Sequence, residues 1–290
     1  MKSTFTARTK LWLRLFALSL CTPFIQGCSL SPLKERTSTV AISLEEANQT
    51  SLGRSFAPLA AEHPDLSGIY ALADPHEAFA ARSILARFAE KSIDVQYYIW
   101  RADTTGYMLL DSLLQAANRG VRIRLLLDDN GINHLDTELA LLNTHDNIEV
   151  RLFNPFSFRS YKRIGFLFDL DRLNHRMHNK SFTVDNTITI VGGRNIGDEY
   201  FGATDQVLFA DLDVIAIGEV VTEVSADFDL YWASPLSYPI DQLISLKSDQ
   251  TLDQIAFDQK ERKNPTRAER YLKVPEQSDL VQNLVNHQPT

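Results

Sequence analysis

The sequence predicts an α/β fold in which a mixed, largely parallel sheet is flanked by helices on both faces. Two observations lead to this prediction. Between residues 75 and 153, helical and extended patterns alternate at spacings too long for hairpins, which is typical of parallel strands joined by helices. Between residues 181 and 191, two short apolar stretches flank Asp185-Asn186, which indicates an antiparallel hairpin.

The elements of the first half follow from the spacing of apolar side chains. Residues 75–90 place their large apolar side chains on one helical face, and Asp74 is the expected N-cap in front of a proline. Residues 92–100 alternate between apolar and polar side chains and predict a strand. Residues 106–119 have the leucine spacing of a helix, which Gly120 ends.

The remaining elements continue the same pattern. Strands are expected at 121–127 and 148–153, with a helix at 135–142 between them. After the hairpin, the sequence predicts a strand at 213–217 and a helix at 219–232.

Composition and patterning divide the 290 residues into four segments. Residues 1–27 have the layout of a signal peptide. Residues 28–65 are rich in Ser, Thr, Glu and Pro without a sustained period and predict a flexible tether. Residues 66–240 hold the α/β domain, and residues 241–290 are interpreted as a polar linker or tail that is truncated before a second domain.

The charge balance bears on the partners of the chain. The formal net charge is −8, and it becomes −12 when the four basic residues of the first 27 positions are removed, because that segment holds no acidic residue. Such an acidic chain makes nucleic acid an improbable partner, since non-specific nucleic-acid binding neutralises phosphates with Lys and Arg. The two cysteines, Cys21 and Cys28, both precede the domain, which excludes a disulfide framework and a Cys-ligated zinc site.

The amino-terminal segment has a basic start, a leucine-rich stretch and small residues near Cys28. The run Ile25-Gln26-Gly27-Cys28 resembles the lipobox of a bacterial lipoprotein, which implies lipid modification of Cys28. Ser29 after the cysteine favours the outer membrane, so the expected location is the bacterial cell envelope, with the protein anchored by lipid. An ordinary cleaved signal, or an uncleaved anchor with an inert Cys28, is the alternative.

The strongest chemical signal begins at His178. In an extended strand, His178 and Lys180 share one face, so an imidazole and an ammonium lie side by side. This pair suits an anionic substrate, because Lys binds a phosphate oxygen and a neutral His attacks phosphorus or transfers a proton. The hairpin returns the chain so that Gly192-Gly193 approaches the same end, where backbone N–H groups and the Asn195 amide can hold a phosphoryl group.

This pattern resembles the signature of the phospholipase D superfamily. That signature is His-x-Lys, four residues, Asp, six residues, Gly-Gly or Gly-Ser, then Asn, and His178, Lys180, Asp185, Gly192-Gly193 and Asn195 match it at those spacings. The flanking stretches SIDVQYYIW, RGVRIRLLLDD, NIEVRLFNPF and VGGRNIGDEYFG are similar to the first half of bacterial cardiolipin synthases. The resemblance covers about residues 65–238 and implies a phospholipase D-like half-domain.

The resemblance implies a catalytic group of His178, Lys180 and Asp185, although Asp185 stands at the hairpin turn and is expected to order that turn. In this family one histidine forms a phosphohistidine, and a second histidine protonates the leaving alcohol. Resolution by an alcohol gives phosphatidyl transfer, and resolution by water gives hydrolysis. No cofactor and no metal are implied.

The resemblance also implies a set of residues around the substrate phosphate. Lys180, Gly193 and Asn195 are the expected phosphate binders, and Gly193 stands where many relatives carry Ser. The family uses a carboxylate to orient its histidine. Asp211 is the candidate for this role, with Asp213 behind it.

The expected substrate is a phospholipid of the phosphatidylglycerol or phosphatidylethanolamine class, met at a membrane through the lipid anchor. Two-motif relatives build one site from two copies of the motif, whereas this sequence carries one. A homodimer or a separate second half is therefore an expected partner. A homodimeric single-motif phosphodiesterase or nuclease, and an inactive truncated remnant, remain as alternative functions.

Several nearby residues allow two interpretations. Asp128-Asp129 follows a strand and is interpreted as a loop or cap pair, with metal binding as the alternative. Tyr97, Tyr98 and Trp100 are interpreted as packing residues, with a stack against lipid as the alternative. The basic residues just before the motif bind a second phosphate or form an exposed basic loop; they are Arg172, His175 and Arg176.

Overall fold

The computed structural model describes residues 30, 32–162, 165, 169–204, 208–247 and 252, and their coordinates fall into two compact units. One unit comprises described residues from 1–32 and 155–175, and the other comprises those from 33–154 and 176–290. The expected signal at 1–27, the lipidation site Cys28 and most of the tail at 241–290 lie outside the described residues.

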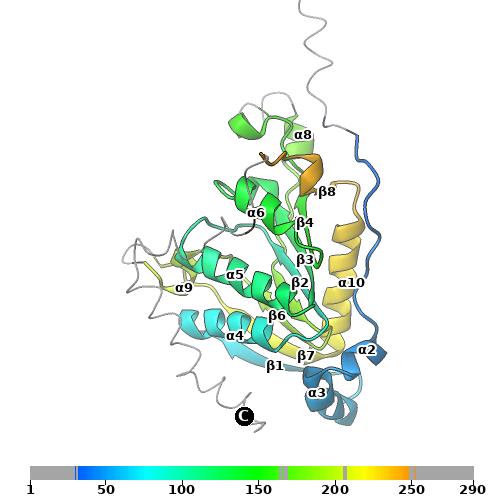
Figure 1. Cartoon of the computed structure of the whole chain (residues 1–290). Helices are drawn as coiled ribbons and strands as arrows, with labels where there is room; N and C mark the ends of the chain where they lie inside the picture. The colour runs from blue at the N-terminus through cyan, green and yellow to red at the C-terminus, as the bar shows by residue number, and fades with distance from the viewer. Residues whose placement is uncertain are drawn as a thin grey trace, which may run out of the picture. The chain divides into compact units, whose positions relative to one another are not determined.

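The larger unit is built on an eight-stranded sheet in the order β1-β7-β6-β5-β2-β3-β4-β8 (Figure 1). Its strands are β1 Ser67–Leu72, β2 Ser92–Tyr97, β3 Arg122–Asp128, β4 Ile148–Phe153, β5 Ser181–Val184, β6 Ile188–Gly192, β7 Asp213–Gly218 and β8 Ser237–Pro239. Parallel pairing joins β2 to β3 and β3 to β4, and the other neighbours pair antiparallel. The predicted mixed sheet is confirmed, but its parallel part is smaller than expected because the hairpin and both edge strands add antiparallel pairs.

Helices cover both faces of this sheet, as predicted (Figure 1). The helices of the larger unit include α2 Leu44–Asn48, α3 Ser51–Glu62, α4 Pro75–Phe88, α5 Thr104–Asn118, α6 Asp136–Leu142, α9 Asp198–Phe201 and α10 Glu219–Ala233. Alternate residues of β2, such as Val95, join the main apolar core together with side chains of α4 and α5. Asp94 points to the other face, where Arg124 bridges it to Asp229 of α10.

Local sequence signals account for several of these elements. The Asp74 carboxylate accepts hydrogen bonds from the backbone N–H groups of His76 and Glu77, so the expected N-cap of α4 is confirmed. Asp185 and Asn186 have φ angles of 50° and 47°, the left-handed conformation that a tight two-residue hairpin turn requires. The predicted hairpin between β5 and β6 is therefore confirmed.

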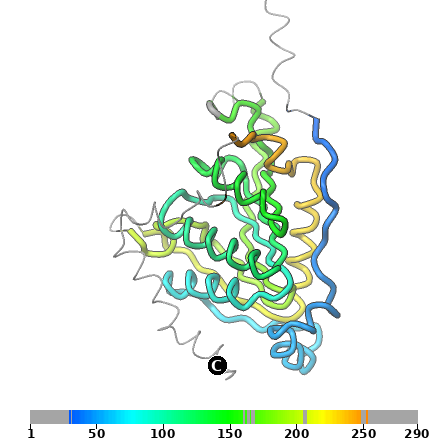
Figure 2. Tube along the Cα trace, in the orientation of Figure 1, coloured from blue at the N-terminus to red at the C-terminus, as the bar shows by residue number. Residues whose placement is uncertain are grey.

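The segment expected as a tether differs from the expectation. Its residues 33–43 run beside α10 (Figures 1 and 2), where the Arg36 guanidinium donates to carbonyl oxygens at the end of that helix. Helix α2 begins with a capping box between Ser43 and Glu46, and Thr50 caps α3. Residues 44–62 are thus largely helical, because polar residues that suggested a linker serve as helix caps.

The smaller unit holds residues 155–175 directly before the motif. It contains the 3-10 helix η3 Arg159–Tyr161 and the short helix α8 Leu170–Leu173. The Arg172 guanidinium donates to the Asp169 carboxylate at 2.6 Å and to the Pro155 carbonyl at 3.0 Å. Arg172 therefore serves to hold this unit together.

Candidate active site

The candidate site lies beyond the carboxyl-terminal ends of β2 and β3, where four loops meet. Gln96 of β2 pairs with Ser181 of β5, so the residues before β5 run past the end of β2. The Met177 backbone N–H donates to the Asp128 carboxylate at 2.8 Å, which ties the same segment to the end of β3. The chain leaving β6 completes the group, since the Ile196 N–H donates to the Ile99 carbonyl at 3.1 Å.

His178 and Lys180 lie side by side, as the strand periodicity predicts. The Lys180 Nζ atom is 3.3 Å from His178 Nδ1, and it donates to the His178 carbonyl at 2.7 Å. Asn179, between them, turns the other way and donates to Asp227 on α10 at 2.9 Å. His178 is exposed and Lys180 is half-buried, so the imidazole is accessible to a substrate.

The electrostatic environment of His178 favours the neutral imidazole over the protonated form. Partial burial, followed by the positive charge of Lys180, lowers the pKa of His178 below its ordinary value. Burial also lowers the pKa of Lys180, while the carboxylates of Asp211 and Asp213 act in the opposite direction. A neutral imidazole beside an ammonium is the arrangement required for attack on a phosphate ester.

Tyr98 is a site residue that sequence reasoning interpreted as packing. Its ring and the His178 ring have centroids 4.5 Å apart with a 37° angle between their planes. The ring contact joins positions 80 apart in the chain and depends on the register of β2 and β5. The sequence indicated that Tyr98 lies near the end of a predicted strand, but it did not indicate that the ring contacts His178.

Gly193 is packed against a carboxylate. A Cβ atom at Gly193 would lie 2.6 Å from Asp211 Oδ1, so the absence of a side chain allows this approach. The His178 ring is hydrogen-bonded to Lys180 and not to Asp211. The role of Asp211 in orienting His178 therefore stays a prediction, as does phosphate binding by Gly193.

Asn195 and Asp213 are buried beneath the site. The Asn195 Oδ1 atom accepts the Ile99 N–H at 3.0 Å, and its side chain is also hydrogen-bonded to the Tyr200 hydroxyl. The Asp213 carboxylate accepts from Arg82 at 2.8 Å. Both residues hold loops in place, and direct binding of phosphate by Asn195 stays a prediction.

Asp185 does not join the other motif residues. It lies at the far end of β5, where its carboxylate accepts the backbone N–H groups of residues 90, 91 and 92 at 2.7–3.0 Å. Its burial and left-handed φ of 50° fix the hairpin turn. The catalytic assignment that the motif suggested is therefore replaced by a structural role, because β5 separates Asp185 from His178.

Asp128 has the loop role favoured by the sequence. Its buried carboxylate accepts hydrogen bonds from Met177 N–H, Asn130 N–H and the Arg176 guanidinium at 2.8–3.0 Å. Burial raises its pKa to about 6, while these partners act in the opposite direction. Among the described residues, no group of three or more His, Cys, Asp or Glu side chains is arranged to hold a metal ion.

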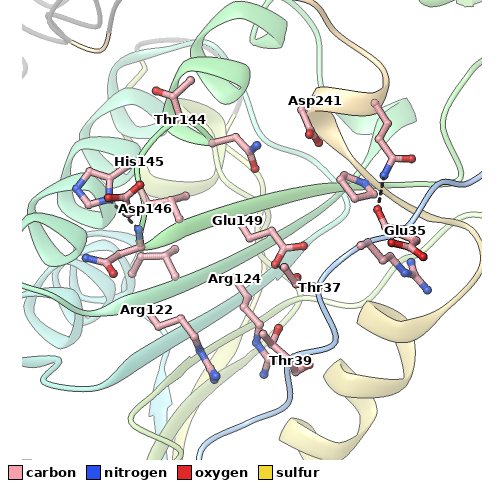
Figure 3. A pocket seen from close by; sticks show the side chains of 17 residues that line it. Glu35, Thr37, Thr39, Arg122, Arg124, Thr144, His145, Asp146, Glu149 and Asp241 are labelled. Atoms are coloured by element: carbon pink, nitrogen blue, oxygen red, sulfur yellow. Dashed lines mark hydrogen bonds between the residues drawn. The ribbon is translucent and has the colours of Figure 1, made fainter.

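A cavity of about 740 Å³ lies elsewhere, at the amino-terminal ends of β3 and β4 (Figure 3). Arg122, His145, Glu149 and Asp241 are among its lining residues, and their charges are mixed (Figure 3). The register of the sheet places this cavity at the edge opposite His178.

Within the part of the chain that is described, no helix combines the length and apolar character needed to cross a bilayer.

Comparison with known proteins gives a consistent set of relatives. Residues 85–232 match the family model described as "Cardiolipin synthase, PLD-like domain". The chain is 49% identical over 235 residues to cardiolipin synthase C of Escherichia coli, which covers 81% of this chain and 50% of that protein. It is 39% identical over 233 residues to an uncharacterized protein of Helicobacter pylori, covering 80% of this chain and 46% of that protein.

Among solved structures, phosphatidylserine synthase of Haemophilus influenzae matches with a TM-score of 0.48 and 17% identity, over 73% of this chain and 48% of that one. The chain thus spans about half the length of the curated relatives described above.

Proposed function

The chain belongs to the family of cardiolipin synthase, PLD-like domains, and on that premise we propose that it is a phosphatidyl-transferring enzyme acting on phospholipid phosphodiesters. The observation that carries the proposal is the placement of the Lys180 ammonium 3.3 Å from an exposed His178 imidazole. The similarity to cardiolipin synthase C supports a phospholipid as the substrate class.

In the proposed reaction, His178 attacks the phosphorus of the donor phospholipid. The imidazole–phosphorus bond forms as the phosphorus–oxygen bond to the headgroup alcohol breaks, and a second histidine gives that alcohol its proton. An acceptor alcohol then attacks the same phosphorus while the second histidine takes up its proton, and the phosphorus–nitrogen bond to His178 breaks. The depressed pKa of His178 supports this role, because the attacking nitrogen needs its lone pair at neutral pH.

Lys180 supplies charge where the reaction needs it. Its ammonium binds a non-bridging phosphate oxygen and stabilises the negative charge that develops during attack. The proposed reaction calls for a second histidine, and we propose a second copy of this chain as its source. A separate polypeptide with the same motif is the other possible source.

A transfer assay tests the proposal. The full chain is incubated with vesicles of labelled phosphatidylglycerol, with and without phosphatidylethanolamine, and labelled products are separated. We expect transfer by the wild type and none by His178→Ala. His145→Ala is the control, because His145 is a half-buried histidine beside the cavity at the opposite sheet edge and should leave activity unchanged. Equal turnover by the wild type and His178→Ala would contradict the proposal.

We further propose that Cys28 carries lipid and anchors the chain in the outer membrane of a bacterial envelope. The sequence Ile25-Gln26-Gly27-Cys28 and the following Ser29 support this location. Labelled fatty acid should appear on the wild-type chain in cells and not on Cys28→Ala. Equal labelling of both chains would contradict the anchor.

A further inference from the structure

The Tyr98 ring contacts both members of the His-Lys pair. It lies against the His178 imidazole with centroids 4.5 Å apart, and the Lys180 Nζ atom is 5.8 Å from its centroid. Tyr98 is half-buried, whereas His178 is exposed. An exposed histidine samples several rotamers unless a neighbour restricts it, and here the neighbour is an aromatic face.

The Tyr98 side chain is itself held from the loop after β3. Its hydroxyl accepts a hydrogen bond from Asn130 Nδ2 at 3.2 Å, and the Asn130 backbone N–H donates to Asp128 at 2.8 Å. The other oxygen of that carboxylate accepts the Met177 N–H at 2.8 Å. One loop therefore holds both the tyrosine ring and the residue that precedes the histidine.

The Tyr98 backbone is fixed by the same loop. A Cβ atom at Gly131 would lie 1.6 Å from the Tyr98 carbonyl oxygen, so only glycine permits this approach. The Trp100 N–H donates to the Gly131 carbonyl at 3.2 Å, next to the contact. Backbone and side chain of Tyr98 are thus both restrained where they meet the imidazole.

We propose that Tyr98 is a positioning residue for His178, which its ring holds in the orientation that presents the imidazole to phosphorus, and that Asn130 fixes the ring. The catalytic part of this inference rests on the proposed phosphatidyl transfer. The structural part concerns the His178 orientation alone and is measurable without turnover. The electron-rich ring face also favours the positive charge of Lys180.

Nuclear magnetic resonance of the full chain, labelled selectively at histidine, tests the structural part. His178→Ala identifies the His178 signal. The ring current of Tyr98 should displace the His178 ring-proton signals upfield in the wild type and in Tyr98→Phe, and this displacement should be lost in Tyr98→Leu. Tyr70→Leu is the control, because Tyr70 lies on the edge strand β1 and should leave the His178 signals unchanged.

Transfer kinetics test the catalytic part. Tyr98→Leu should lower kcat by a factor on the order of 10 to 100 with little change in KM, since a misplaced nucleophile reacts slowly although the substrate still binds. Tyr98→Phe should retain most of the activity. Asn130→Ala should lower kcat by a similarly small factor. The double variant Tyr98→Phe/Asn130→Ala should lose no more activity than either single variant, because each change removes the same Asn130–Tyr98 hydrogen bond.

The resonance comparison and the transfer kinetics can contradict different parts of the proposal. His178 signals that are the same in the wild type and Tyr98→Leu would overturn the proposal, as would an unchanged kcat in Tyr98→Leu. A wild-type chain without any transfer activity would count against the proposed function. In that case the resonance comparison would still support or overturn the positioning of His178 by Tyr98.

Discussion

Gly192 ends β6 and Gly193 follows it, and the two glycines have different neighbours. Their substitution should therefore affect stability and activity to different extents. A Cβ at Gly193 would meet the end of the Asp211 side chain at 2.6 Å, which is free to rotate aside. A Cβ at Gly192 would meet backbone atoms of residues 212 and 213 at 2.5 Å. The first substitution displaces a side chain, whereas the second pushes strands β6 and β7 apart.

We therefore expect Gly193→Ala to lower transfer activity while changing the free energy of unfolding by less than about 1 kcal/mol. Gly192→Ala should destabilise the chain by roughly 2 kcal/mol or more, since backbone atoms must move. Denaturant unfolding and the transfer assay on both variants measure these effects. Equal stability losses would show that the Asp211 contact is as rigid as the strand pairing.

Lys180 influences His178 by its charge, in addition to the phosphate binding that we propose for it. Removing the ammonium in Lys180→Met should raise the pKa of His178, because the Lys180 charge is one of the two causes that lower it. The acid limb of the pH–rate profile should move to higher pH, and kcat should fall by about 10²–10³. A histidine-resolved titration measures the pKa shift, and an unchanged or lowered value would refute this electrostatic account.

Sequence reasoning predicted at this scale that His178 and Lys180 lie side by side, because the two residues are two positions apart and local periodicity places them together. It also expected Asp185 to order the hairpin turn, but it did not find the Tyr98 contact or the hydrogen bonds from Asp185 to residues 90–92. Both depend on which strands pair and in what register, and a single sequence leaves these long-range pairings open.

Among the elements, helices α5 and α9 are joined at their N-termini by two hydrogen bonds. Asp103 caps α5 and accepts the Asp198 N–H at 2.8 Å, while Asp198 at the start of α9 accepts the Thr105 N–H at 2.9 Å. Burial, with the nearby Asp198 charge, raises the pKa of Asp103 to about 6. The carboxylates of Asp103 and Asp198 thus join the loops after β2 and β6, and Asp103 is the one whose pKa is raised.

This raised pKa predicts how stability depends on pH. The folded chain binds the Asp103 proton more tightly than the unfolded chain does. The resulting contribution to the free energy of unfolding is therefore complete below about pH 4 and is lost as the pH rises through about 6. Asp103→Asn should show a flatter decline, and its stability deficit against the wild type should be larger at pH 4 than at pH 7. Unfolding at several pH values measures this difference, and a deficit that grows with pH would contradict the assignment.

Prediction from sequence succeeded for elements with their own local signals. Helix α4 has a capping aspartate followed by proline, and the β5–β6 hairpin has a turn pair that accepts left-handed backbone. It did not find β1, because most of its residues are exposed and lack apolar alternation. It also missed β8, which has three residues and forms by pairing with β4, about 85 positions earlier in the sequence.

At the scale of the whole molecule, the proposed reaction needs two histidines, and this sequence carries one copy of the motif. If a second copy supplies the other, activity per chain should rise with protein concentration as dimers form. Mixing wild type with excess His178→Ala should lower the activity per wild-type chain, because mixed pairs lack one reacting imidazole. Activity per chain that does not depend on concentration, in samples shown to be monomeric by light scattering, would contradict this arrangement.

The central claim is that His178 forms a covalent bond to phosphorus during phosphatidyl transfer. The most direct measurement uses donor phospholipid labelled at its phosphate, followed by denaturation at alkaline pH, where a phosphorus–nitrogen bond survives. We predict label on the wild-type chain and on His145→Ala, release of that label in acid, and none on His178→Ala. Label that persists on His178→Ala, or a wild-type chain that turns over without acquiring label, would contradict the account.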